Sequence, residues 1–346
     1  MQMIVGLLIA IALLVILILK TKVPPFLALI VAAVTVGLIG GMPAEKISGS
    51  ITTGFGSTLG SIGIIIGFGV MMGQIFERTG AAERMALTFI KLFGKKHEHW
   101  AMALTGFIVS IPIFCDSSFV ILSPIAKAIG LRMTKLESQK IVAIGVPLAA
   151  GLVITHSLIP PTPGPLGVAG TFGVDVGNFI LLGLLIALPM TIASCFYALY
   201  LGKKIYQLPA DDGETWIRPE MQEEYTNLGL QPDRELPSTF IAFLPLAVPI
   251  ALILSNTLSS ALGAIGMFST IVSFLGTPVI AVGIGLLLAI CTLARRIPRD
   301  EALKEMSKGL SSAGVIVFVT GAGGALGQIL KDSGTGAFAA EKLAAT

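Results

Sequence analysis

Residues 141–174 read IVAIGVPLAAGLVITHSLIPPTPGPLGVAGTFGV, an apolar segment with a cluster of prolines at its centre. Apolar runs flank the cluster on both sides, but four prolines within six positions cannot continue a helix. Broken backbone at membrane depth is tolerated only where it is buried in protein or lines a cavity. The stretch therefore predicts a discontinuous membrane helix near 141–176, the geometry that secondary transporters use to expose backbone groups to a substrate.

The composition of the whole chain also indicates a membrane protein. Of 346 residues, 54% are hydrophobic and 12% are charged, against about 25% charged in a soluble domain. The first block, 1–19, has no charge, no basic leader and no cleavage site, so we expect a retained helix and not a signal peptide. The net charge of +3 fits basic loops of a membrane topology and not nucleic-acid binding. Expected spans are 2–19, 24–41, 57–76, 141–155, 177–201, 238–255, 277–294 and 311–330.

The apolar run 100–126 lies between two basic segments, 78–96 and 127–140, which both predict a cytoplasmic location. We therefore expect a re-entrant helical hairpin near 100–135, with its tip around the polar string 115–118. Two short spans with a displaced loop remain the alternative. Asp116 is the only acidic or basic residue in the run. A charge at such depth costs about 2.5–3.5 kcal/mol, so Asp116 faces a cavity, an ion path or a partner unless it caps a short helix.

An internal repeat becomes visible when the chain is shifted by 254 residues. GFGVMMGQIFERTG at 67–80 then lies over GAGGALGQILKDSG at 321–334. Basic residues precede span 24–41 but follow its partner 277–294, so the two copies are expected to run in opposite directions. This inversion needs an odd number of crossings between the copies, and 238–275 has room for one or two spans.

The repeat predicts the domain organisation. We expect a first transmembrane repeat at 1–202, a polar cytoplasmic connector at 203–236, and the start of a second, inverted repeat at 237–346. The second copy lacks counterparts of the hairpin and the broken helix, so we expect it to be incomplete at its C-terminus. On this basis, we expect the 346-residue chain not to transport by itself.

The residues near the two interruptions suit a hydroxy-carboxylate. A half-helix N-terminus offers free N–H groups and partial positive charge to a carboxylate, which we place between 117–118 and 162–164. Nearby hydroxyls add donors and acceptors, and Asp116 or His156 would carry a coupled proton, although a lone histidine is more often structural. The expected substrate-binding residues are Asp116, Ser117, Ser118, Thr155, His156, Ser157, Thr162 and Gly164.

Other classes of site find no support in the sequence. It contains no GxSxG, HExxH or P-loop, so we expect no enzyme activity and no catalytic residue. Cys115, Cys195 and Cys291 lie in apolar stretches without metal or redox spacing, and are expected to be inert thiols. We expect no cofactor, no metal and no nucleic-acid partner, and a homo-oligomer is left open.

Several motifs together resemble the gluconate:proton symporter (gluconate permease) family. They are MPAEKISGSITTGFGSTLGS, GFGVMMGQIFERTG, FGKKHEHWAMALTGF, FCDSSFVILSP and HSLIPPTPGP, and the resemblance covers nearly the whole chain. It implies a multi-pass inner-membrane permease that carries a small organic anion such as gluconate together with protons. It also implies two related halves, each with a hairpin and a broken helix.

Two departures from the family pattern leave the substrate open. Several gluconate carriers have Tyr-Glu or Phe-Glu where this chain has Cys115–Asp116, and some have His where it has Thr162. Glycerate, another hydroxy acid or D-serine therefore stay as candidates, as do sodium coupling, exchange, and a truncated protein that does not transport. The expected fold is an all-α polytopic membrane protein, an inverted-repeat secondary transporter with a re-entrant hairpin and a broken helix.

Overall fold

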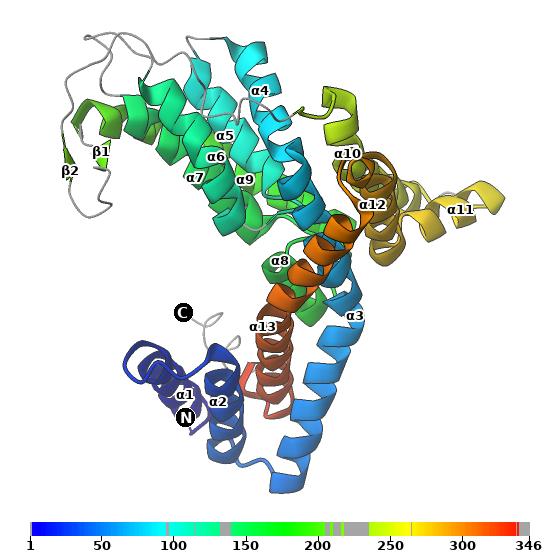
Figure 1. Ribbon diagram of the computed structural model, residues 1–346. Helices are drawn as coiled ribbons and strands as arrows, with labels where there is room; N and C mark the ends of the chain where they lie inside the picture. Colours follow the sequence, from blue (N-terminus) through cyan, green and yellow to red (C-terminus); the bar gives the residue numbers. More distant parts are fainter. Residues whose placement is uncertain are drawn as a thin grey trace. The chain divides into compact units, whose positions relative to one another are not determined.

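The computed structural model describes residues 2–94, 97–113, 115–131, 140–204, 208–209, 216–217, 235–263, 265–336 and 338. In this part of the chain nearly every segment is helical, apart from one pair of two-residue antiparallel strands, β1 (Leu208–Pro209) and β2 (Trp216–Ile217). Figure 1 shows the helices in chain order. They are α1 (Gln2–Leu19), α2 (Pro25–Ile39), α3 (Ala44–Thr79), α4 (Ala81–Phe93), α5 (Glu98–Val109), α6 (Cys115–Leu131), α7 (Lys140–Leu158), α8 (Pro163–Phe172), α9 (Val176–Lys204), α10 (Thr239–Ala261), α11 (Met267–Leu275), α12 (Pro278–Thr292) and α13 (Arg299–Asp332).

The lengths and apolar composition of these helices are those of a polytopic membrane protein. Within the described residues, five helical segments are long and apolar enough to cross a bilayer, namely α3, α9, α10, α13 and the stretch Pro278–Arg296. Shorter apolar helices lie at Val5–Leu19, Pro25–Ile39 and Val142–Leu158. The predicted all-α membrane fold is confirmed. The predicted spans 57–76 and 311–330 lie within longer helices, because α3 begins at Ala44 and α13 at Arg299.

The chain folds into two compact units that interleave along the sequence. The first consists of Met1–Gly67, Leu166–Val174 and Ser311–Thr346, and the second of Phe68–Pro165 and Asp175–Leu310. The predicted domain division at the connector 203–236 stays a prediction, since most of that connector lies outside the described residues.

The first unit is held together by close contacts at small residues. A side chain at Gly37 of α2 would meet Ile47 of α3, so the two helices approach closely after the turn that joins them. Further along, Ser50 of α3 donates a hydrogen bond to the Asp332 carboxylate at the end of α13, at 2.6 Å. Three aromatic rings from α2, α3 and α13 also cluster, namely Phe26, Phe55 and Phe318.

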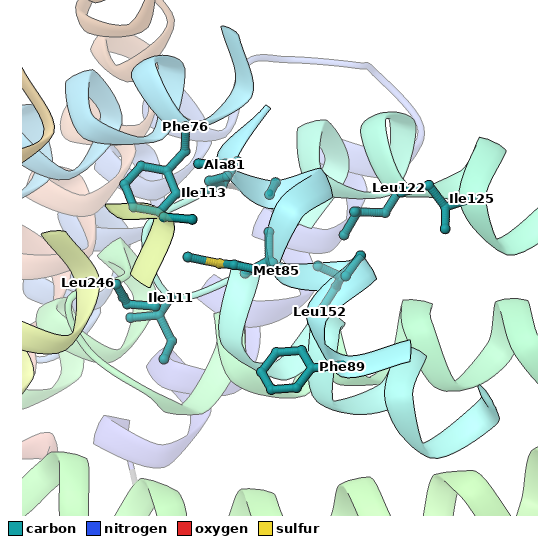
Figure 2. Packing of buried hydrophobic residues seen from close by; sticks show 14 of the residues in the cluster. Phe76, Ala81, Met85, Phe89, Ile111, Ile113, Leu122, Ile125, Leu152 and Leu246 are labelled. Carbon is teal, nitrogen blue, oxygen red and sulfur yellow. The ribbon is translucent and has the colours of Figure 1, made fainter. Parts of the chain in front are cut away.

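The second unit contains the largest apolar core, which Figure 2 shows from close by. Phe76 of α3 and Met85 of α4 lie in this core together with residues of α5, α6, α7 and α10. Ile111 and Ile113, from the turn between α5 and α6, are also buried in it. The turn is therefore anchored by apolar packing and does not project into solvent.

Helices α10 and α12 of the second unit form an antiparallel pair. A side chain at Gly276 would meet Asn256, and one at Gly285, further along α12, would meet Pro249, which lies earlier on α10. Between them α11 has 9 residues, about 14 Å of helix, too short to cross a core of about 30 Å. Within the described part of 238–275 there is thus one helix long enough to cross, and the inverted repeat stays a prediction.

The helix boundaries also follow the 254-residue shift. It superimposes α2 on α12 and α3 on α13 to within about one residue at each end, and Gly80 and Gly334 share the left-handed φ of 73°. In the first unit Gly54 of α3 lies against Gly324 of α13. In the second unit Gly309 of α13 lies against Val70 of α3. The shift maps each contact onto the other to within one residue, and α3 runs antiparallel to α13.

Candidate functional site

The predicted hairpin region contains α5, a short turn and α6. Helix α5 has 12 residues, about 18 Å, too short to cross a hydrocarbon core of about 30 Å. Helix α6 has 17 described residues and is followed by 132–139, which lie outside the described residues, so the hairpin stays a prediction. The tip lies earlier than predicted, because the turn begins at Ser110 and the polar string Cys115–Ser118 is already the first turn of α6.

The predicted helix break lies between α7 and α8. Helix α7 ends at Leu158 and α8 begins at Pro163, with the turn residues of the proline cluster between them. The buried Thr162 hydroxyl donates to the carbonyl oxygen of Ile159 at 2.7 Å and so satisfies a backbone acceptor inside the break. The discontinuous helix that the prolines predict is present in the structure.

Two reciprocal glycines hold the hairpin against the broken helix. A Cβ at Gly106 of α5 would lie 2.9 Å from the amide nitrogen of Leu152 on α7 and still closer to the Leu148 carbonyl. A Cβ at Gly151 of α7 would lie 2.9 Å from the amide nitrogen of Phe107 and still closer to the Ala103 carbonyl. The two backbones are therefore in contact with no side chain between them, as at small-residue crossings in membranes.

The hairpin tip and the helix break lie at the same end of this crossing. Phe107, near the end of α5, belongs to one buried cluster with Ile159, which directly follows α7, and with Ala187 of α9. At the same level a Cβ at Gly183 of α9 would meet the backbone of Leu158. A Cβ at Gly73 of α3 would lie 2.7 Å from the Pro112 carbonyl in the hairpin turn. The tip is thus enclosed by α3, α7 and α9.

Among the residues that the structure describes, three buried hydroxyls at this end have no hydrogen-bond partner. They belong to Ser110 at the end of α5, Ser118 in the first turn of α6 and Thr155 in the last turn of α7, and all three residues have 0% exposure. Other buried hydroxyls donate to a carbonyl one turn earlier, as Thr105 does to Ala101 at 2.7 Å and Thr191 to Ala187 at 2.8 Å. An unpaired buried hydroxyl costs about 1–3 kcal/mol, which favours a ligand or water as the missing partner.

The predicted site residues differ in their surroundings. Ser118 and Thr155 are buried, and His156 is half-buried next to Thr155. Ser157 is exposed and, two positions after Thr155, lies on the opposite side of α7. Gly164 is exposed in the first turn of α8, with open space where a side chain would lie. Asp116 and Ser117 lie in the first turn of α6, and their side chains fall outside the described part of the structure.

Sequence reasoning missed Ser110. Its only sequence signal is a hydroxyl directly before Ile-Pro at the end of an apolar run. In that run Asp116 was the predicted site residue because it carries a charge. Asp116 itself is the second residue of α6, a place where a helix N-terminus stabilises a carboxylate.

The contacts of α5 with α9 show how α5 is oriented relative to the basic end of α9. Its last residues are Lys203 and Lys204, and the Lys204 ammonium lies 4.6 Å from the centre of the Tyr200 ring. Trp100, at the start of α5, packs edge-on against Phe196, with ring centres 5.7 Å apart. Phe107 instead packs at the level of Ala187, about 14 Å further along α9. The start of α5 therefore lies at the basic, aromatic end of α9, and α5 runs away from that end.

Comparison with known proteins places this arrangement in a family. The family model described as GntP family permease matches residues 2–346. A gluconate permease of Pseudomonas aeruginosa is 36% identical over 327 residues, which are 93% of this chain and 70% of the relative. The high-affinity gluconate transporter of Escherichia coli is 34% identical over 339 residues, 97% of this chain and 74% of the relative.

Two further relatives have related names. An uncharacterised permease of Haemophilus influenzae is 45% identical over 350 residues, 99% of this chain and 70% of the relative. The Gnt-II system L-idonate transporter of Escherichia coli is 32% identical over 339 residues, 97% of this chain and 74% of the relative. These relatives are named as permeases and transporters and not as enzymes, in agreement with the sequence prediction. From the match over nearly its entire length, this chain belongs to the GntP family of permeases.

Proposed function

We propose that this permease takes up gluconate or a similar sugar acid together with protons across the inner membrane, by alternating access. Uptake by the 346-residue chain would contradict the expectation, drawn from the repeat, that this chain does not transport by itself. The names of its relatives support a sugar-acid substrate, since two of them carry gluconate in their names and one carries L-idonate. The observation that carries the proposal is the group of three buried, unpartnered hydroxyls at the hairpin tip and the helix break. Such groups favour a ligand or water as a partner, and a polyhydroxylated anion is a ligand of this kind.

The location of this group supports a transport site. Secondary transporters bind their substrates near the bilayer midplane, at discontinuous helices. Basic residues gather at one end of the second unit, at the C-terminus of α9 and just after α12, where Arg295 and Arg296 lie. Arg84 of α4 donates to the Pro237 carbonyl just before α10, so it belongs to this end as well. By the positive-inside rule, this end faces the cytoplasm, and the hairpin enters the membrane from there.

The helix N-termini supply the positive potential that a carboxylate needs. Helix α6 begins after the hairpin turn, and α8 begins after the helix break. Pro163 and Pro165 have no backbone N–H, so Gly164 is the donor between them at the start of α8. With about half a positive charge at each helix N-terminus, these two helix starts favour an anion. In this proposal Ser118 and the first turns of α6 and α8 bind the carboxylate, while Asp116 or His156 carries the coupled proton.

The test is radiolabelled gluconate uptake into membrane vesicles under imposed gradients. An inward proton gradient should drive accumulation above the equilibrium level, and a protonophore should abolish it. An inward sodium gradient at constant pH should have no effect. Accumulation that follows sodium would replace the proposed coupling with sodium symport. Uptake that needs internal gluconate and no gradient would identify an exchanger.

A further inference from the structure

We infer that Ser110 and Thr155 bind the hydroxyl groups of the substrate's carbon chain, separately from the groups that bind its carboxylate. This inference rests on the proposed function and assigns a part of the same site to a part of the substrate. It starts from the three unpartnered hydroxyls, which differ in where they stand on their helices.

Ser110 and Thr155 both stand at helix C-termini. Ser110 directly follows α5, and its own amide donates to the Gly106 carbonyl at 3.1 Å. Thr155 lies in the last turn of α7, where its carbonyl accepts from the amide of Ile159 at 2.9 Å. A helix C-terminus carries about half a negative charge and presents free carbonyl groups. Such an environment opposes a carboxylate but suits a ligand that donates hydrogen bonds.

Ser118 has the opposite setting. It lies in the first turn of α6, where the N-terminal end of the helix carries partial positive charge. The tip region thus contains two kinds of hydroxyl, one beside positive helix ends and one beside negative helix ends. A sugar acid has the same division, because its carboxylate only accepts hydrogen bonds whereas its chain hydroxyls both donate and accept. The polarity of the helix ends therefore orients the substrate, with the chain hydroxyls at Ser110 and Thr155.

Burial makes this assignment specific. Ser110 is fully buried, and the hairpin turn that follows it is fixed by Ile111 and Ile113 in the core and by the close approach of Gly73 to Pro112. A rigid, water-poor site built to bind a substrate hydroxyl discriminates strongly against analogues that lack it, since its own polar group is then left unpaired. Ser110 is accordingly a residue that determines specificity for hydroxylated acids.

The experiment compares uptake of D-gluconate with uptake of a series of singly deoxygenated gluconates by wild type, Ser110→Ala and Ser118→Ala. For Ser110→Ala, kcat/KM for gluconate should fall about tenfold, while at least one deoxygenated analogue should be carried as well as by wild type. For Ser118→Ala, kcat/KM should fall by one common factor for every acid in the series. Thr105→Val is the matched control, because this buried hydroxyl of α5 is already paired with Ala101. It should leave the ratios between substrates unchanged.

A second readout follows the stability of the ligand-free protein. Because the Ser110 hydroxyl has no partner, Ser110→Ala should leave the melting temperature unchanged or raise it, while Ser110→Thr should keep the substrate preference. A clear fall in the melting temperature of Ser110→Ala would show a structural hydrogen bond and overturn the inference. So would an equal loss for all substrates. If the wild-type protein carries none of these acids, the proposed function fails, and this inference fails with it. That failure is seen in the wild type before any substitution, so it differs from a failure of the inference alone, which is seen only in the variants.

Discussion

The backbone contact between α5 and α7 allows a sharp test of how the site is held, through the substitution Gly151→Ala. The added Cβ would lie 2.9 Å from the Phe107 amide nitrogen and closer still to the Ala103 carbonyl. Ordinary contacts of a Cβ begin near 3.4 Å, so the two helices must separate by roughly half an ångström to one ångström. Overpacking of this kind costs about 1–3 kcal/mol.

The matched control lies on the same helix. A Cβ at Gly145 of α7 meets nothing within 4 Å, so Gly145→Ala gains helix propensity of about 0.5–1 kcal/mol without a clash. Thermal unfolding of the purified protein should therefore give a lower melting temperature for Gly151→Ala and an equal or higher one for Gly145→Ala. Gluconate uptake should fall only in the first variant, since the crossing positions the hairpin tip beside the helix break.

The double variant Gly106→Ala/Gly151→Ala adds a further check. The first added methyl group already separates the helices, so the second should cost less in the double variant than it does alone. If Gly151→Ala and Gly145→Ala melt at the same temperature, then α5 and α7 are not in backbone contact at this crossing. The hairpin tip would then not be held rigidly beside the helix break.

Three other predictions test separate parts of the description. Asp116→Asn should abolish accumulation driven by a proton gradient while gluconate exchange continues, and unchanged accumulation would make Asp116 a helix cap. The second test uses a protein without Cys115, Cys195 and Cys291 and an impermeant thiol reagent. The reagent should label His97→Cys only from the cytoplasmic side and Ile265→Cys only from the outside. Labelling of His97→Cys from outside would exclude the hairpin. Gly324→Ala should lower the melting temperature, because its Cβ would clash with the Thr58 hydroxyl of α3. Gly323→Ala should not lower it, since a Cβ there meets nothing within 4 Å. Equal effects of the two substitutions would contradict the α3–α13 packing.

Much of the fold was predictable because its determinants are local. Apolar runs of membrane length identify the spans whatever their neighbours are, since the hydrophobic thickness to be crossed is set by the bilayer. The prolines at 160–165 interrupt a helix in any context, because each one removes a backbone donor and clashes with the preceding turn. The membrane class, the broken helix and the repeat at 254 residues could therefore be obtained from the chain itself.

The tertiary structure decided those features that depend on how the helices pack against one another. The extension of α3 back to Ala44 runs through a stretch rich in Gly, Ser and Thr with little helix propensity, which contacts α13 at Gly54 and Ser50. The length of α11, only 9 residues, was likewise not evident from the apolar run 238–275. Ser110 could not be distinguished from Thr105 in sequence, because both are hydroxyls in an apolar arm. Only packing shows that the hydroxyl of Thr105 is paired within its own helix and that of Ser110 is not. Hydrogen-bond satisfaction is a property of the folded surroundings, and it is this property that points to the site.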